Sequence, residues 1–469
     1  MNSLLARCLP LLVLAFPLAC PAQTTGPALK PAQQRAFEIY RELVEINTVT
    51  ATGDTGRAAD AMAARLLAAG FPAADVQVFK PAARKGNLVA RLRGTGARKP
   101  IILMAHIDVV EAKPADWTTE PFKLVEKDGY YYARGSGDDK FMAATWIANL
   151  IRYREEGFKP DRDLVVVLET DEEILDSNNV GIHWLLTNHR DLLDAAFALN
   201  EGGGVSTLGG KAITNGLQTS EKVFMNYKLE VTNAGGHSAQ PRKDNAIYRL
   251  AAALSKVGAF DFPVELNETT RAYLVKAAPF NGAKGADMVA VAERNDAEAA
   301  ARLSREPQFN ALLRTTCVAT MLEGGHAMNA LPQVARATVN CRVMPGVPME
   351  RIRDTLVRVI GDDQVAVKAD WTPVPSPPSP LDPTLVSTIE KLSKEFWPDA
   401  VVLPIMSSGG TDGTHTRNAG IPTYGHSGLA SPFDEPGRAH GKDERVSVKA
   451  FYQAQEYLYR LVKALAGDR

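Results

Sequence analysis

The chain is poor in cysteine: only four of its 469 residues are cysteines. It also lacks an excess of charge of either sign, because 53 lysines and arginines stand against 54 aspartates and glutamates, which gives a formal net charge of -1. A protein with this balance has no overall field that attracts nucleic acid or an anionic membrane. We therefore expect the partner to be a small molecule or a peptide, and no nucleic acid.

The apolar run near the N-terminus, Leu9 to Ala19, is too short to span a hydrocarbon layer of about 30 Å, so we expect no membrane span. It follows Arg7 and leads into small residues that end at Ala22, which is the order of a secretory signal. We expect residues 1–22 to be a signal peptide and the protein to be secreted or periplasmic. Lipidation of Cys20 is the less favoured alternative, because Pro17 stands where a lipoprotein signal has a branched aliphatic residue.

Removal of that signal leaves Cys317 and Cys341 as the cysteines of the mature chain. A disulfide between them is compatible with an oxidising compartment. Two reduced cysteines packed as small core residues are equally compatible with the sequence. The sequence leaves both alternatives open.

A hydrophobic content of 45% over this length is enough for two domains with cores of their own. Strand-like and helix-like segments alternate up to about residue 204, which predicts an α/β domain with a mostly parallel central sheet flanked by helices. From Val223 the pattern changes to that of an α+β domain, and six prolines between Pro373 and Pro383 predict a linker back. We expect a first domain of residues 35–217 and 373–469 and an inserted domain of residues 218–372.

Short apolar runs at residues 100–105, 164–168 and 195–199 read as strands buried on both faces. Polar residues that follow such strands converge at the carboxyl edge of the sheet. Five residues with side chains that bind metals are candidates for a shared site: His106, Asp138, Glu173, Glu201 and His440. Two divalent ions with one bridging carboxylate need about this number of ligands. Imidazole and carboxylate without thiolate favour zinc, with cobalt or manganese as substitutes.

Two further acids accompany the candidate ligands. Asp108 lies two positions after His106, where its carboxylate is able to orient the imidazole; the alternative is a loop cap. Glu172 precedes Glu173 in a run of three acids, and an acid that is not a ligand is able to act as the general base; the alternative is a solvated acidic turn. The glycine-containing turn before Asp138 also has an ordinary reading, a helix N-terminus that favours acids.

In this order the motifs resemble the M20 metallopeptidases, which include aminoacylase, carboxypeptidase G, succinyl-diaminopimelate desuccinylase and carnosinase-like dipeptidases. The resemblance covers nearly the whole mature chain. It implies that His106, Asp138 and Glu201 hold one zinc and that Asp138, Glu173 and His440 hold the other. It also implies that Asp108 orients His106, that Glu172 is the general base and acid, and that the Asp138-Asp139 peptide is cis.

The resemblance further implies that the inserted domain is a lid that also forms a homodimer. His237, in a Gly-His-Ser motif, is expected to stabilise the oxyanion in the partner subunit's site. Asn329 and Arg342 match positions that contact the substrate, the arginine by clamping a carboxylate. Gly410 and Thr411 match a substrate-binding loop beside the second metal.

We therefore predict a metallopeptidase that hydrolyses an amide bond next to a free carboxylate, as a carboxypeptidase or dipeptidase of small peptides. An N-acyl-amino-acid amidohydrolase uses the same site and differs only in the pocket for the acyl side. A binding protein that has lost catalysis is a further alternative, which the intact Glu172 disfavours.

Overall fold

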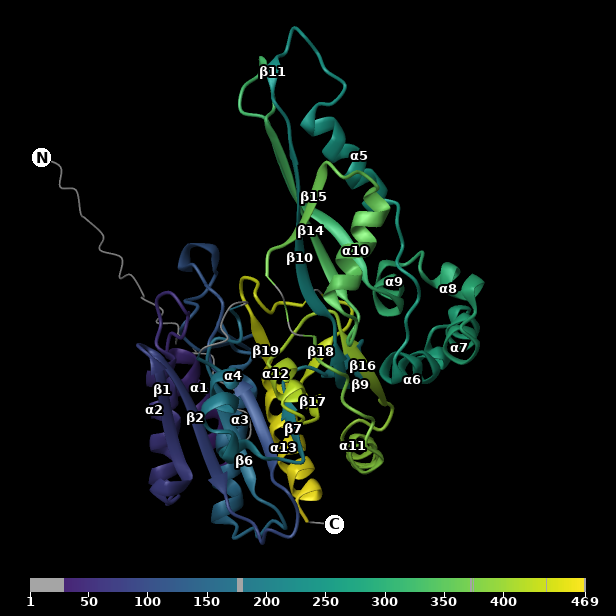
Figure 1. The fold of residues 1–469 in the computed structure, drawn as a ribbon. Helices are drawn as coiled ribbons and strands as arrows, with labels where there is room; N and C mark the ends of the chain where they lie inside the picture. Colours follow the sequence, from purple (N-terminus) through teal and green to yellow (C-terminus); the bar gives the residue numbers. More distant parts are fainter. Residues whose placement is uncertain (1–28, 175–179, 372, 374, 436, 468–469) are drawn as a thin grey trace, which may run out of the picture.

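The structure, a computed structural model, describes residues 29–174, 180–371, 373, 375–435 and 437–467. A large body is built around a long sheet, and a narrow arm projects from it (Figure 1). The expected signal peptide, residues 1–22, lies outside the described residues, so export stays a prediction. In the described part of the chain, no helix combines the length and the apolar character needed to cross a bilayer.

A ten-stranded mixed sheet forms the centre of the large body, in the order β1-β2-β6-β3-β7-β17-β9-β8-β18, with β16 beside β9. The strands are β1 (Val76–Ala82), β2 (Lys85–Leu92), β3 (Ile101–His106), β6 (Leu164–Glu169), β7 (Phe197–Asn200), β8 (Val205–Leu208), β9 (Lys211–Glu221), β16 (Val401–Ser407), β17 (Thr423–Gly425) and β18 (Ala430–Pro432). Of these, β6, β3, β7 and β17 are parallel neighbours. The predicted α/β class is confirmed.

Helices cover both faces of this sheet. One face carries α1 (Pro31–Glu45), α2 (Thr55–Ala68), α3 (Lys140–Glu155), α11 (Pro383–Phe396) and α13 (Val448–Leu465), and the other carries α4 (Ile182–Asn188). Along β3, Leu103 packs into the first core while Ile102 and Met104 pack into the second. Coverage of both faces explains why this strand has no polar alternation.

The arm, called the lid below, is the antiparallel sheet β12-β14-β10-β15 with two helices on one face. Its elements are β10 (Val223–Thr232), α5 (Ala246–Gly258), β12 (Thr316–Gly324), β14 (Val334–Val343), α10 (Met349–Ile360) and β15 (Val365–Ala369). At the far end of the lid, β11 (Gly236–His237) pairs with β13 (Ala330–Leu331) (Figure 1). The tip is thus a two-stranded ribbon well away from the central sheet.

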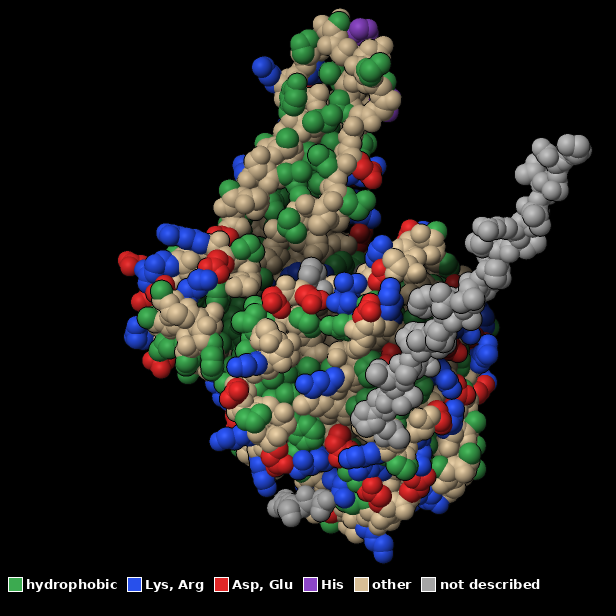
Figure 2. All heavy atoms as spheres, turned by 180° about the vertical axis from the view of Figure 1, so that it is seen from behind, with side chains coloured by type: hydrophobic (Ala, Val, Ile, Leu, Met, Phe, Trp, Pro, Cys, Tyr) green, Lys and Arg blue, Asp and Glu red, His purple; other side chains and the backbone are tan. Residues whose placement is uncertain are grey.

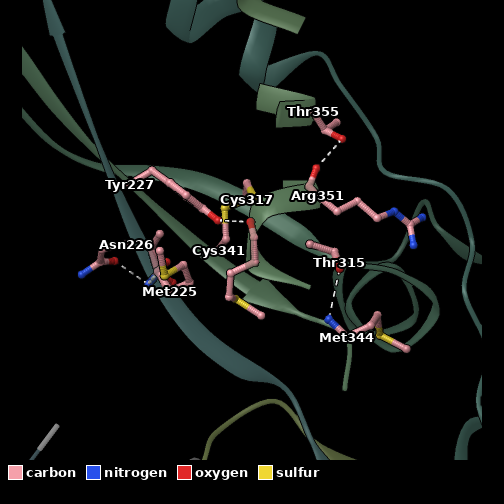
Figure 3. Close-up of a disulfide and its surroundings, with 11 residues drawn as sticks. Met225, Asn226, Tyr227, Thr315, Cys317, Cys341, Met344, Arg351 and Thr355 are labelled. Carbon is pink, nitrogen blue, oxygen red and sulfur yellow. Dashed lines mark hydrogen bonds between the residues drawn. A yellow bond between two sulfur atoms is a disulfide. The ribbon is translucent and has the colours of Figure 1, made fainter. Parts of the chain in front are cut away.

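A disulfide joins Cys317 of β12 to Cys341 of β14 (Figure 3). The two residues are directly opposite each other in the strand register. Of the two alternatives compatible with the sequence, the structure has the disulfide. It fastens the edge strand of the lid to a central strand.

A block of four helices interrupts the lid in the sequence: α6 (Glu268–Ala277), α7 (Lys284–Arg294), α8 (Ala297–Leu303) and α9 (Pro307–Leu313). Their apolar residues form a core with Val401, Leu403 and Ile405 of β16, and not with the lid sheet. The range 218–372 that we expected as one inserted domain therefore contains two packed bodies. The domain boundaries themselves stay a prediction.

Candidate metal centre and substrate site

Three strand ends bring the predicted ligands of the large body together. His106 is the last residue of β3, Glu173 follows β6 by a short turn, and Glu201 directly follows β7. Parallel strands with adjacent carboxyl ends explain the convergence of side chains that are far apart in sequence. Asp138 comes from the loop before α3, and His440 from the loop before β19 (Arg445–Ser447).

These ligands form two groups that share Asp138. In the first group, His106 Nε2 lies 3.1 Å from Asp138 Oδ1 and 3.9 Å from Glu201 Oε1. In the second, His440 Nε2 lies 3.1 Å from Asp138 Oδ2 and 3.0 Å from Glu173 Oε2. The structure thus places the five predicted ligands as a pair of three-residue groups, with one carboxylate between them.

Asp108 lies in the same cluster, and it contacts Glu172 and Glu173 as well as His106. The Nδ1 atom of His106 is 3.1 Å from the backbone oxygen of Asp108, and 3.6 Å from the carboxylate. The carboxylate instead accepts the backbone N–H groups of Glu172 at 3.2 Å and Glu173 at 3.1 Å. Asp108 therefore holds the turn that carries Glu172 and Glu173, while its backbone contacts the imidazole.

The first acid of that turn, Asp171, has a different environment from the two that follow. Its φ of 66° is in the left-handed region, and its carboxylate pairs with Lys85 at 2.5 Å and accepts from Thr50 at 3.0 Å. Lys85 compensates the charge of Asp171, so this acid adds less to the repulsion within the turn.

Glu444 is a residue of the centre that the sequence reasoning missed. Its buried carboxylate accepts the backbone N–H groups of Gly135 at 3.0 Å and Gly137 at 2.8 Å, and pairs with Arg134 at 2.6 Å. These contacts shape the loop that delivers Asp138, whose peptide bond to Asp139 is cis, as the resemblance implies. An acid four positions after His440 was the only signal in the sequence.

The electrostatics of the cluster show an excess of negative charge. Hydrogen bonds with Asp138 and Glu173 raise the pKa of His440 to about 10. Burial disfavours the charged form of His106, but its contacts with Asp108 and Asp138 outweigh this and raise the pKa. Burial raises the pKa of Glu201 to about 8. Carboxylates crowded in this way are stabilised by cations.

Buried polar atoms without a hydrogen-bond partner also surround the cluster. Within the described residues they include Oδ2 of Asp139, Oδ2 of Asp412 and both side-chain polar atoms of Asn200. Such atoms are costly unless another group satisfies them. The donor set of imidazole nitrogens and carboxylate oxygens, with this surplus of acceptors, fits divalent cations.

The predicted substrate-binding loop, Gly410-Thr411, is organised by a second acid that the sequence reasoning missed. Glu221, the last residue of β9, is buried and accepts from Thr411 at 2.9 Å and Thr414 at 2.7 Å. It also pairs with the buried Arg417. This network fixes the loop at the point where the chain enters the lid.

The predicted residues of the lid lie at its two ends. His237 and Asn329 are exposed in and beside the ribbon at the tip, far from the central sheet (Figure 1). Arg342 lies at the base, where its Nη1 donates to the backbone oxygen of Ser408 at 3.1 Å. The structure brings Arg342 to the Gly410 loop of the same chain, but it does not bring His237 or Asn329 to the metal ligands.

Comparison with known proteins gives related sequences and folds. Residues 102–464 match the sequence profile of peptidase family M20/M25/M40. A probable carboxypeptidase S-like 2 of Dictyostelium discoideum is 30% identical over 78% of this chain and 71% of its own length. The human N-fatty-acyl-amino acid synthase/hydrolase PM20D1 is 28% identical over 79% of this chain and 75% of its length. An M20 family metallo-carboxypeptidase from Sulfolobus solfataricus shares the fold, with a TM-score of 0.68 at 17% identity over 92% of this chain and 98% of that one.

Proposed function

Because the chain belongs to peptidase family M20/M25/M40 and is a metal-dependent hydrolase of that family, we propose that it cleaves an amide bond next to a free carboxylate. In this proposal it releases a C-terminal amino acid from small peptides, as a carboxypeptidase or dipeptidase. The observation that carries the proposal is the pair of ligand groups that share Asp138. The contact of Arg342 with Ser408, beside the Gly410 loop, supports recognition of a carboxylate.

His106, Asp138 and Glu201 would hold one divalent cation, and Asp138, Glu173 and His440 the other. When bound, such a pair of cations, zinc in our proposal with cobalt or manganese as substitutes, polarises a carbonyl and lowers the pKa of a water.

Glu172 is the proposed general base and acid. Asp108 accepts the backbone N–H of Glu172 at 3.2 Å, which fixes the backbone of this turn, and Glu172 belongs to neither ligand group. It takes a proton from the attacking water and passes it to the leaving amine.

We propose that the enzyme is a homodimer and that His237 stabilises the oxyanion in the partner's site. The placement of β11 at the lid tip, away from its own metal ligands, supports a role in another subunit (Figure 1). The lid also offers a surface for pairing, because hydrophobic side chains run along it (Figure 2), including Val318, Met321 and Leu322 on the edge strand β12, each at least 60% exposed. Unpaired edges of this kind readily pair with another chain.

Subunit mixing tests the dimer. Glu172→Gln and His237→Ala variants, each nearly inactive alone, should regain activity when coexpressed, since one of the mixed sites then has both groups intact. Mixtures that stay inactive, in a dimer shown to contain both variants, would contradict the action of His237 across subunits.

A specific observation favours a second candidate function, the hydrolysis of N-acyl amino acids. A cavity of about 780 Å³ borders Gly137 and Ala439, the neighbours of Asp138 and His440. Its lining combines apolar residues, among them Phe396, Trp397 and Leu429, with charged ones such as Lys211, Asp399 and Arg438. A cavity of this size accommodates a small molecule. The name of the human relative, an N-fatty-acyl-amino acid synthase/hydrolase, supports the same substrate class.

One experiment separates the candidates: release of free amino acid from dipeptides, tripeptides and N-acyl amino acids by the zinc-loaded protein, with and without chelator. Chelator-sensitive cleavage of peptides supports the carboxypeptidase or dipeptidase, and cleavage of acyl substrates alone supports the second candidate. No release from any substrate would overturn both. Glu172→Gln is the matched inactive control.

A further inference from the structure

The guanidinium of Arg342 lies against an aromatic ring. Arg342 on β14 is directly opposite Phe224 on β10, and its guanidinium carbon lies 4.6 Å from the centre of the Phe224 ring. Contacts of this kind between a cation and an aromatic face are attractive and hold the planar group in place.

Phe224 in turn stacks on Trp371, with ring centres 5.3 Å apart and planes only 9° from parallel. Trp371 belongs to the segment that leaves the lid after β15, while Phe224 stands at the start of β10, where the chain enters it. Both rings are half-buried. The two chain segments at the lid base therefore build one aromatic support under Arg342.

Among the described residues, no acid forms an ion pair with Arg342, and its side-chain hydrogen bond is the one from Nη1 to the backbone oxygen of Ser408. Burial lowers its pKa, which is the direction expected for a cation that has lost water without gaining a counter-charge. Most of its five N–H donors thus remain available for an anion.

We propose that Phe224 and Trp371 are positioning residues, which hold the Arg342 guanidinium so that its free edge meets the carboxylate of the substrate. This inference rests on the proposed function, and it gives two residues outside the metal centre a part in carboxylate recognition through Arg342. A fixed planar guanidinium binds a carboxylate through two parallel hydrogen bonds and discriminates against a neutral carboxamide. A lysine at this position cannot reproduce that geometry.

The kinetic test compares glycyl-leucine with glycyl-leucinamide. Phe224→Ala should raise KM for glycyl-leucine by roughly 3- to 30-fold, the range of a cation–π contact, with little change in kcat. The preference for the free carboxylate should fall by the same factor. Phe224→Tyr and Trp371→Phe keep an aromatic face and should stay close to the native protein. A fall in kcat with KM unchanged would overturn the positioning role.

Asn340→Ala is the matched control. Asn340 lies on the same face of β14, two residue pairs along the strand from Arg342, and donates to Asn226 across the same two strands at 2.8 Å. Its removal disturbs the sheet to a similar degree without touching the aromatic support, so KM should not change. A KM increase equal to that of Phe224→Ala would overturn the proposal.

A double-mutant cycle measures the coupling itself. If Phe224 acts through Arg342, Phe224→Ala should add almost nothing in an Arg342→Lys background, whereas independent effects would multiply. Binding of free leucine to the zinc-loaded protein, measured by calorimetry, gives the same cycle without turnover. Multiplying effects on leucine binding overturn the positioning role, while intact coupling without hydrolysis of any peptide overturns the proposed reaction and leaves the positioning role supported.

Discussion

The metal centre and the lid tip are built in opposite ways. Three ligands follow or end buried strands and two come from loops, and the ligand atoms lie 3.0 to 3.9 Å apart in the recorded pairs of the two groups, with Asp108 and Glu444 holding the neighbouring turns. His237 and Asn329 are exposed, on a ribbon of two short strands. The difference teaches that a single chain assembles both groups of metal ligands, whereas the lid tip lies apart from them. A role for the tip in the reaction depends on the partner subunit that we propose.

The largest expected effect is in the metal centre. Glu172→Gln should lower turnover by about 10²- to 10⁴-fold, because the proton of the attacking water then has no acceptor. Metal content, measured by atomic emission, should stay at the native value. Loss of metal in this variant would mean that Glu172 is a ligand.

The corresponding change at the lid tip is His237→Ala. It should lower kcat by about 10²- to 10³-fold, the usual cost of a missing oxyanion donor. Metal content, and the oligomeric state followed by sedimentation, should be unchanged, since His237 lies at the lid tip, away from the metal ligands (Figure 1). If kcat stayed at the native value, the lid tip would have no part in the reaction and the metal centre alone would form the catalytic site.

Smaller effects should come from residues that support each region. Asp108→Asn removes a carboxylate that accepts two backbone N–H groups, and should weaken metal affinity by about 10- to 100-fold. Asn233→Ala is its counterpart at the tip, where Asn233 accepts the N–H of Gly235 at 3.0 Å. Metal titration should leave Asn233→Ala at native affinity. Equal losses in both variants would contradict the separation of the two regions.

The smallest effect on activity should follow removal of the disulfide. Cys317→Ala with Cys341→Ala should lower the free energy of unfolding of the lid by about 3 kcal/mol, as expected for a loop of this size. Turnover should change little, because the metal ligands are in the other body. Denaturant titration and kinetics on the same sample measure both, and a large loss of activity would show that the two regions are more tightly coupled than their packing suggests.

The clustering of His106, Glu173 and Glu201 was predictable because apolar runs such as β3 mark buried strands, and the ends of parallel strands converge at one edge of the sheet. The roles of Glu444 and Glu221 were not predictable, because a buried acid that accepts hydrogen bonds from backbone N–H groups or threonine hydroxyls looks the same in the sequence as a surface acid. The packing of α6–α9 on β16 was not predictable either, since the pattern of an amphipathic helix does not specify the sheet against which its apolar face packs. The role proposed for Arg342, binding of a carboxylate, rests on the resemblance to the M20 family. The stacking of Phe224 and Trp371 against it could be found only from the structure.

The position of the four-helix block has a mechanical consequence. Since the chain leaves the lid after α5, packs α6–α9 on β16 and returns at β12, it crosses between the two bodies four times, where a simple insertion crosses twice. Each added tether restricts rotation about the lid base. A graft of this lid onto another catalytic body would therefore have to carry the helical block and its β16 docking surface, or close the gap with a new loop.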